Sequence, residues 1–405
     1  MLPQAAIFLT VMLDLLAFGM VIPDIQLRGE KLVTSLLGEQ GAAGQMGGIL
    51  IGLGISSYSI IQFIFGPIMG RWSDFIGRRP VLIVTTILAV LSSLVYGFAT
   101  EYWVLLLARS LQGLAGANLG VAYAYVSDSS EPDQRAKAMG QLGAAFGIGF
   151  LLGPPVGALL VKAGGGGPFV LGLASAGMSL INLWFVWFFL PESLRKENVA
   201  TLKENRFAMM ARAFRTPALG VLLALFFVAN YAFANLESTF FLLAETRYLL
   251  DQFQAALVLV IVGGTSAFVQ GFIVPRITPA LGEVKILRMS YALQAPSLAI
   301  LPWTMPWLPL ILGTIFLSFA SGIGQPSISS LISKATPPNM SGGIFGVTQS
   351  LGAIARIVGP LTAIPMLKFK FWLPYTFAAV LLLVPLIGML LFKELEPEAA
   401  PEAVF

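Results

Sequence analysis

Long apolar stretches recur along the whole chain of 405 residues, and short polar segments separate them. A helix needs about 20 mainly apolar residues to cross the hydrocarbon core of a bilayer, and twelve stretches meet this requirement. The pattern therefore predicts an all-α polytopic membrane protein with twelve transmembrane helices. The predicted spans are 5–27, 46–70, 80–99, 102–127, 136–162, 168–190, 218–243, 252–275, 284–302, 308–333, 341–367 and 371–392.

The two halves of the chain resemble each other. Residues 116–154 align without a gap with residues 322–360, at an offset of 206, and several glycines and prolines coincide. A second register, offset by 205, matches the stretch that begins at Gly66 with the stretch that begins at Gly271. Parallel repeats in an apolar chain are typical of transporters whose substrate path runs between the repeats.

The repeat also sets the predicted division of the chain. We expect two pseudo-symmetric six-helix bundles that fold as one intramembrane unit. The predicted parts are an N-terminal bundle at 1–190, a cytoplasmic linker at 191–217, a C-terminal bundle at 218–392 and a cytoplasmic tail at 393–405.

Composition supports the membrane class and limits the chemistry. Charged residues are 11% of the chain, against about 25% in soluble domains, and apolar residues are 57%. The chain has no cysteine and no histidine, so disulfides and thiolate metal sites are excluded and any proton chemistry must use carboxylates. No P-loop and no dense carboxylate cluster occur, so we expect no nucleotide site, no metal and no other cofactor.

The basic residues indicate the orientation. With the N-terminus placed inside, sixteen lysines and arginines fall in cytoplasmic segments and six in outer ones. This bias follows the positive-inside rule and predicts that both termini are cytoplasmic. The net charge of +4 is then explained mostly by basic residues that set the membrane orientation, and we expect no nucleic-acid partner. The first apolar stretch is long and lacks a small-residue cleavage site, so we interpret it as the first span and not as a signal peptide.

Charges inside membrane spans are costly and are functional candidates by default. Four lie clearly within the predicted spans: Asp14, Arg109, Glu237 and Arg356. Asp14 is mid-span in the first helix and is the leading candidate for proton coupling or substrate binding, against a structural hydrogen-bonding role. Glu237 is the second candidate acid, and a permanent pair with Arg356 would make it structural instead.

Ordered motifs in the first half carry a family resemblance. GRWSDFIGRR at 70–79 resembles the signature loop of the major facilitator superfamily, and RSLQGLAG at 109–116 resembles its second motif. GIGFLLGPPVG at 147–157 looks like the motif associated with antiporters of that superfamily. LDLLAFGMVIP at 13–23 and LPES at 190–193 are similar to segments of the tetracycline-type drug:proton exporters.

The resemblance assigns roles to the motif residues. It implies a cytoplasmic latch that favours the outward-facing state, against the alternative that the arginines only anchor topology. The latch residues would be Gly70, Asp74, Gly77, Arg78, Arg79 and Asp128. The second-half loop has lost the aspartate and the arginine pair, so we expect the latch to be asymmetric. The antiporter motif would consist of Gly149, Gly153, Pro154 and Gly157, in a curved helix at a moving interface.

The two intramembrane arginines differ in what the family predicts. Arg109 resembles the motif arginine that is proposed to tune the proton affinity of a neighbouring acid such as Asp14. Arg356 is not part of the drug-exporter pattern. It could bind an anionic group of the substrate, which would favour amphipathic anions or lipids. Asp24 and Arg28 lie near the outer mouth and are expected to be interfacial.

The expected substrate cavity is apolar with a few polar groups, which suits an amphipathic organic molecule. Its predicted lining residues are Asp14, Tyr58, Gln62, Tyr123, Asn230, Tyr231, Gln294, Gln325 and Arg356.

We therefore predict a proton-coupled secondary active exporter of multidrug or tetracycline-like compounds. It would work as a monomer, by alternating access, in a bacterial inner membrane. The alternative within transport is a carrier of lipids, sugars or organic anions by symport or facilitated diffusion. A membrane enzyme would need a nucleophile and base pair or a metal cluster, for which a chain without histidine and cysteine offers little.

Overall fold

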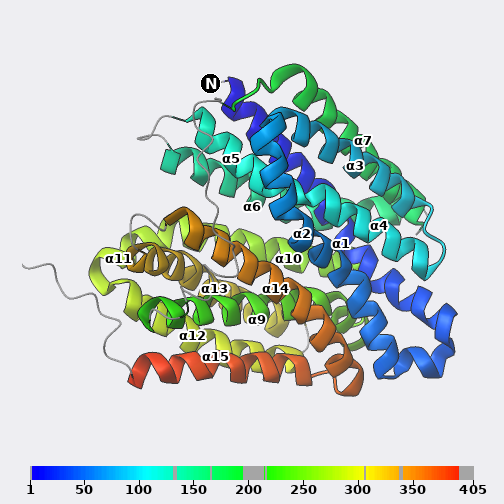
Figure 1. The fold of residues 1–405 in the computed structure, drawn as a ribbon. Coiled ribbons are helices and arrows are strands. Elements are labelled where there is room, and N and C mark those ends of the chain that lie inside the picture. Colours follow the sequence, from blue (N-terminus) through cyan, green and yellow to red (C-terminus); the bar gives the residue numbers. More distant parts are fainter. Residues whose placement is uncertain are drawn as a thin grey trace, which may run out of the picture. The chain divides into compact units, whose positions relative to one another are not determined.

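The computed structural model describes residues 2–130, 135–164, 167–194, 214, 217–304, 307–336 and 341–391, which are almost entirely helical and contain no strand (Figure 1). Within these ranges nine helices are long and apolar enough to cross a membrane, and two shorter apolar helices add to them. Most of the predicted linker and the whole predicted tail lie outside the described residues. The division of the chain at these segments therefore stays a prediction.

The first half forms six helical rods. They are α1 (Leu2–Ala43), α2 (Gln45–Ile76), α3 (Arg78–Gly97), α4 (Tyr102–Ala115) continued by the 3-10 turn η1 (Gly116–Asn118) and α5 (Leu119–Ser129), α6 (Arg135–Ala163) and α7 (Pro168–Phe189). Each rod corresponds to one of the first six predicted spans, and α3 and α7 end one or two residues before the predicted span ends. The largest difference is at α1, which runs on past the predicted end at residue 27, through a polar stretch that keeps a helical conformation up to a break at Gly38.

The second half forms six more rods. They are α9 (Pro217–Arg247), α10 (Gln252–Phe268) continued by the π-helix η3 (Val269–Ile273) and α11 (Val274–Leu281), α12 (Glu283–Ile300) with the 3-10 turn η4 (Leu301–Trp303), α13 (Trp307–Ala335), α14 (Ser341–Phe369) and α15 (Leu373–Leu391). The order and positions of the rods match the last six predicted spans. The predicted all-α fold class is confirmed.

The chain groups into two compact units that do not follow the sequence halves. Unit 1 contains Met1–Leu202 together with Glu237–Val260 and Arg356–Phe371, so it holds the first six rods and parts of α9, α10 and α14. Unit 2 contains Lys203–Leu236, Ile261–Ala355 and Trp372–Phe405.

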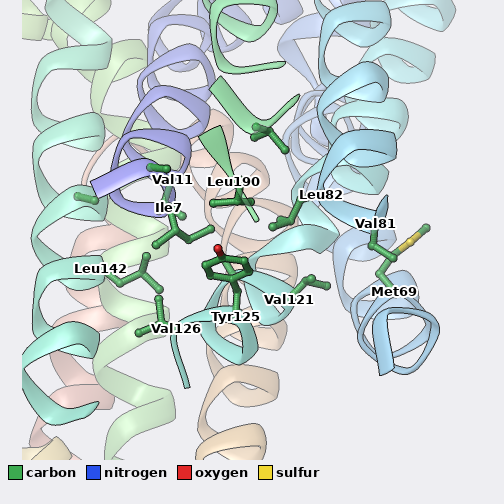
Figure 2. Close-up of a cluster of buried hydrophobic side chains, with 14 of the residues drawn as sticks. Ile7, Val11, Met69, Val81, Leu82, Val121, Tyr125, Val126, Leu142 and Leu190 are labelled. Carbon is green, nitrogen blue, oxygen red and sulfur yellow. The ribbon is translucent and has the colours of Figure 1, made fainter. Parts of the chain in front are cut away.

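One apolar cluster in unit 1 draws on all six of the first rods. It joins residues from α1 to α7 around the ring of Tyr125 on α5 (Figure 2). The ring is fully buried, and its hydroxyl donates to the backbone carbonyl of Pro191, 3.0 Å away, just after α7. This bond satisfies the one polar atom that the ring brings into the cluster.

Glycines of the predicted antiporter motif let α6 lie directly against α1. A Cβ atom at Gly157 would lie 1.9 Å from the carbonyl oxygen of Met20, and one at Gly153 would lie 2.6 Å from the Cα atom of Gly19. A Cβ atom at Gly149 would lie 2.7 Å from the carbonyl oxygen of Met12. Small residues allow such backbone contact between membrane helices, and here they hold α6 against the helix that carries Asp14.

Candidate functional site

Asp14 lies half-buried on α1, and two neutral amides hold its carboxylate. Asn182 on α7 donates from Nδ2 to Oδ1 of Asp14 at 2.7 Å, and Asn118 in η1 donates from Nδ2 to Oδ2 at 2.8 Å. Among the described residues, no lysine or arginine lies within ion-pair distance of this carboxylate. Both oxygens therefore accept hydrogen bonds, as suits a carboxylate anion.

The break between α4 and α5 positions Asn118. The carbonyl of Gly116 accepts the backbone N–H of Leu119 within the 3-10 turn, and it also accepts a hydrogen bond from Nε2 of Gln62 at 2.8 Å. The ring of Tyr58 packs so closely on Gly116 that a Cβ atom there would lie 2.3 Å from its hydroxyl oxygen. Tyr58 and Gln62, both predicted as substrate-binding residues, thus stabilise the turn that brings Asn118 to Asp14.

Arg109 on α4 is buried in an aromatic cage. Its guanidinium lies 5.0 Å from the ring centroid of Tyr58 and 5.4 Å from that of Phe18, and it donates from Nη1 to Oε1 of Gln112 at 2.8 Å. The Nε atom is buried and has no hydrogen-bond partner. Arginine over aromatic faces is a cation–π arrangement that gains strength where water is excluded. The structure therefore separates Arg109 from direct contact with Asp14, and the predicted tuning role stays a prediction.

Glu237 on α9 is the second candidate acid within a predicted span. Its carboxylate makes no hydrogen bond or ion pair with any described residue, but it lies within electrostatic range of Arg356 and Arg109. Arg356 on α14 likewise makes no hydrogen bond or ion pair in the part of the chain that is described. The predicted direct pair of Glu237 with Arg356 is therefore not formed in this conformation.

Contacts within unit 1 fasten α9 and α14 to α1 and α2. Gln26 donates from Nε2 to the carbonyl of Glu237 at 2.7 Å, and Ser56 donates from Oγ to the carbonyl of Ile357 at 2.8 Å. Lys368 at the end of α14 forms an ion pair with Glu30 of α1.

Glycines of α2 also bring the backbone of α14 close. A Cβ atom at Gly48 would lie 2.8 Å from the Cα atom of Pro365, and one at Gly52 would lie 2.7 Å from the carbonyl oxygen of Pro360. The two helices are therefore in close backbone contact on the same side of unit 1 as the ion pair of Lys368.

A buried polar cluster lies near the end of α1 that carries Glu30. Tyr96 donates its hydroxyl to Oδ2 of Asp24 at 2.5 Å, and Arg28 lies 3.1 Å from the same oxygen, with its guanidinium 4.2 Å from the Tyr96 ring centroid. Asp24 is only 6% exposed. Tyr96 of α3 covers Asp24 and Arg28 and supplies a polar partner, and their interfacial position stays a prediction.

The predicted latch residues form a compact ion network. Arg78 at the start of α3 donates from Nε to Oδ2 of Asp128 at 3.0 Å and from Nη1 to Oγ of Ser73 at 2.6 Å, and Nη1 also pairs with Asp74. Gly77 adopts φ 107° and turns the chain from α2 into α3. This conformation favours glycine, because a Cβ atom would be strained there.

Glu192 is a member of this network that the motifs alone did not reveal. Its carboxylate accepts from the backbone nitrogens of Arg78 and Arg79 at 2.9 and 3.1 Å, so it caps the free N–H groups at the start of α3. Arg79 donates in turn from Nη2 to the carbonyl of Trp187 at 2.6 Å. The latch of the first half thus reaches from α2 to the end of α7. Gly70 lies in α2, with open space where its Cβ would be.

The remaining predicted substrate-binding residues are distributed over both units. Tyr123 of α5 is half-buried in unit 1. In unit 2, Tyr231 is buried against the rings of Phe227 and Phe377, and Asn230 donates to a carbonyl of its own helix. Gln294 is buried and Gln325 is half-buried, also in unit 2. Their role in binding stays a prediction.

Asn118 and Asn182 are site residues that were not predicted from the sequence. Charge identifies the proton-coupling candidates Asp14, Glu237 and Arg109, whereas the groups that contact Asp14 are neutral amides. An asparagine within an otherwise apolar span was the available signal, since buried polar groups in membrane helices need partners. Within the described part of the chain, no group of three or more acidic residues could hold a metal ion.

Residues 7–360 match the family described as the Major Facilitator Superfamily, and the chain belongs to this superfamily. It is a multi-pass membrane transporter and not an enzyme, as the relatives and structural neighbours are transporters.

Three similar proteins illustrate the relationship. The mouse "Major facilitator superfamily domain-containing protein 10" is 27% identical over 434 residues, which cover 96% of this chain and 92% of the mouse protein. The class G tetracycline resistance protein of Vibrio anguillarum is 28% identical over 357 residues, 87% of each chain. The crystal structure of the human organic anion transporter MFSD10 (TETRAN) matches with a TM-score of 0.73 at 26% identity, over 96% of this chain and 99% of that one.

Proposed function

We propose that this protein is a proton-coupled secondary active transporter that exports amphipathic organic compounds by alternating access. The observation that carries the proposal is the environment of Asp14: a carboxylate within a membrane span, half-buried, held by two amides and without a cationic partner among the described residues. An acid in this setting is a functional candidate, because no permanent ion pair neutralises it. It can gain and lose a proton as its access to water changes.

Glu237 supports the same function as a second proton site. It lies in a span, with no direct partner among the described residues but close to two arginines, so a change in its protonation would alter the charge of the whole cluster. Asp14 and Glu237 carry two negative charges when ionised, and Arg109 and Arg356 carry two positive charges, so these four residues balance in formal charge. Export by proton exchange would therefore change this balance at each half-cycle.

The relatives agree with an amphipathic substrate. The protein from Vibrio anguillarum is a tetracycline resistance protein, and the human structure is that of an organic anion transporter. The relatives come from bacteria and from mammals, so the bacterial inner membrane stays a prediction. The cytoplasmic placement of both termini and action as a monomer likewise remain part of the proposal.

The test uses purified protein in liposomes that contain a pH-sensitive dye. Tetracycline and tetraphenylphosphonium are added outside, and substrate entry should drive protons out and make the lumen more alkaline. Asp14→Asn should abolish this proton movement. The matched control is Glu101→Gln, which removes an exposed carboxylate before α4 whose side chain makes no cap hydrogen bond. Equal proton movement in wild type and Asp14→Asn would refute the proposed role of Asp14.

Arg356 favours a second candidate, a carrier of organic anions. Its guanidinium makes no hydrogen bond or ion pair within the described residues, and a planar guanidinium suits a carboxylate ligand. With fluorescein as the anionic probe in the same vesicles, Arg356→Gln should abolish uptake, while Arg356→Lys should retain part of it. Unchanged fluorescein uptake in Arg356→Gln would exclude this candidate.

A further inference from the structure

The two amides on Asp14 have different surroundings. Asn182 is fully buried, and its Oδ1 atom has no hydrogen-bond partner. Its Nδ2 atom donates to Oδ1 of Asp14 at 2.7 Å and, more weakly, to the carbonyl of Thr10 at 3.3 Å. Asn118 has no such orphaned atom. A buried carbonyl oxygen without a donor is unfavourable and calls for an explanation.

The hydrogen bonds seen here fit only the charged form of Asp14. A carboxylate accepts at both oxygens, whereas a neutral carboxyl carries an O–H that must find an acceptor. With both amides in their present orientation, that O–H would face an N–H donor. The Oδ1 atom of Asn182, on the same amide that now donates to Asp14, is a buried acceptor without a partner.

We propose that Asn182 is a positioning residue for proton exchange at Asp14 and that its amide turns over when the carboxyl becomes neutral. In the turned orientation Oδ1 accepts the O–H of Asp14 and Nδ2 takes the position that Oδ1 leaves. The proton passes between water and the carboxylate oxygen, and no covalent bond of Asn182 changes. Asn118 keeps its orientation and favours the charged form.

Local geometry permits this motion. The terminal torsion of asparagine joins an sp³ to an sp² carbon and has broad, roughly two-fold preferences, so turning the amide keeps the side chain within its volume. The Thr10 carbonyl loses only a long hydrogen bond and keeps its place in the helix ladder of α1.

Few charged groups around Asp14 could respond to its protonation in place of the Asn182 amide. On the elements packed against α1, the titratable or charged groups away from the helix ends are Tyr58 on α2, Arg109 on α4, and Tyr123 and Tyr125 on α5, and unit 1 adds Glu237 of α9 and Arg356 of α14. The spans of α6 and α7 carry no acidic or basic side chain beside Asp14. The amide of Asn182 is therefore the polar group on α7 that can adapt to both forms of the acid.

This inference rests on the proposed proton exchange at Asp14, but its test does not require transport. Infrared difference spectra of the protein in vesicles, recorded against pH, follow the carboxyl C=O band that disappears in Asp14→Asn. Asn118→Leu removes a donor whose hydrogen bond is stronger to the carboxylate than to the neutral carboxyl, so the midpoint of the band should move up by about one pH unit. Asn182→Leu removes a partner of both forms, so the midpoint should stay close to that of the wild type.

An upward shift of the same size in Asn182→Leu and Asn118→Leu would show that Asn182 is a fixed donor and would overturn the proposal. A second measurement needs no asparagine variant. In wild-type protein labelled with ¹³C-asparagine, the difference between low and high pH should contain a side-chain amide C=O band that is absent in Asp14→Asn. A flat amide region would also overturn the proposal. If the band responds while transport moves no protons, the proposed function fails and the amide switch stands.

Discussion

Two buried tyrosines show how a polar side chain in the apolar spans is matched to a specific partner. Tyr96 and Tyr102 lie close together in the chain, both buried, and each donates its hydroxyl to an acceptor. The acceptor of Tyr96 is the carboxylate of Asp24, whereas that of Tyr102 is the backbone carbonyl of Leu50. Hydrogen bonds to charged groups contribute about 1.5–3 kcal/mol, against about 1 kcal/mol between neutral groups.

Tyr96→Phe should therefore destabilise the protein more than Tyr102→Phe. We expect about 2 kcal/mol for Tyr96→Phe, because the buried Asp24 carboxylate loses a donor, and about 1 kcal/mol for Tyr102→Phe. Thermal unfolding of both variants in the same detergent measures the difference. Equal losses would mean that Arg28 alone satisfies Asp24.

At the scale of the helix, close backbone contact is specified by glycines at particular positions of α6. Gly157 faces the carbonyl of Met20, whereas Gly147 on the same helix has open space where its Cβ would be. The sequence pattern identified the glycine-rich segment, but glycine density does not say which glycine makes the contact. That depends on the crossing point of α1 and α6.

Gly157→Ala should destabilise the protein by about 1–3 kcal/mol, since the new methyl group overlaps backbone atoms that cannot move aside. Gly147→Ala should be neutral or slightly stabilising, because alanine is the better helix former. The fraction of monodisperse protein that remains after graded heating compares the two variants. A harmless Gly157→Ala would imply that α1 and α6 separate freely.

The ion pair of Arg78 with Asp128 recurs in the second half with its charges reversed. The two repeat registers place Glu283 opposite Arg78 and Lys334 opposite Asp128. Glu283 accepts from Lys334 at 2.7 Å and from Ser330 at 2.6 Å, and Gly282 before it has φ 73°, as Gly77 has a positive φ before Arg78. The loop sequence alone shows only that the aspartate and the arginine pair are lost. The reversed ion pair becomes visible when the loop and the facing helix are considered together.

The Glu283 pair should make stability depend on pH. Burial raises the pKa of Glu283, but the hydrogen bonds from Lys334 and Ser330 outweigh it, and the net pKa is lowered. The pair therefore stabilises the protein above the ordinary pKa of glutamate, and this contribution is lost as the pH falls through the lowered pKa.

Lys334→Ala should cost about 0.5–1 kcal/mol at pH 7, because Lys334 is largely exposed, and less near pH 3, below the ordinary pKa of glutamate. The exchange of both residues, Glu283→Lys with Lys334→Glu, should restore most of the loss. Unfolding curves at the two pH values test both statements. A loss of equal size at pH 3 would assign the effect to packing of the lysine stem.

At the scale of the whole molecule, apolar spacing predicted the twelve rods and their order, because span length follows from bilayer thickness. The same spacing could not predict that α1 continues beyond residue 27, since this stretch is polar and its helix depends on tertiary contacts. Nor could it predict how Asp14 is held. Asn118 and Asn182 lie 64 residues apart and meet Asp14 only after folding.

The proposed alternating access requires that the contacts joining α14 to α1 and α2 in unit 1 separate once in every cycle. The ion pair of Glu30 with Lys368 is at the end of α1 that the positive-inside rule places outside. Its two side chains are only partly exposed, at 27% and 17%.

The natural chain has no cysteine, so Glu30→Cys combined with Lys368→Cys gives a protein with two thiols and no others. A short bifunctional methanethiosulfonate should link these thiols in the conformation described here and abolish transport, and a reducing agent should restore it. Each single-cysteine variant, treated with the same reagent, is the control for simple modification. Full transport by the linked protein would mean that α1 and α14 stay together throughout the cycle, so the substrate would have to pass by a route that does not open at this end.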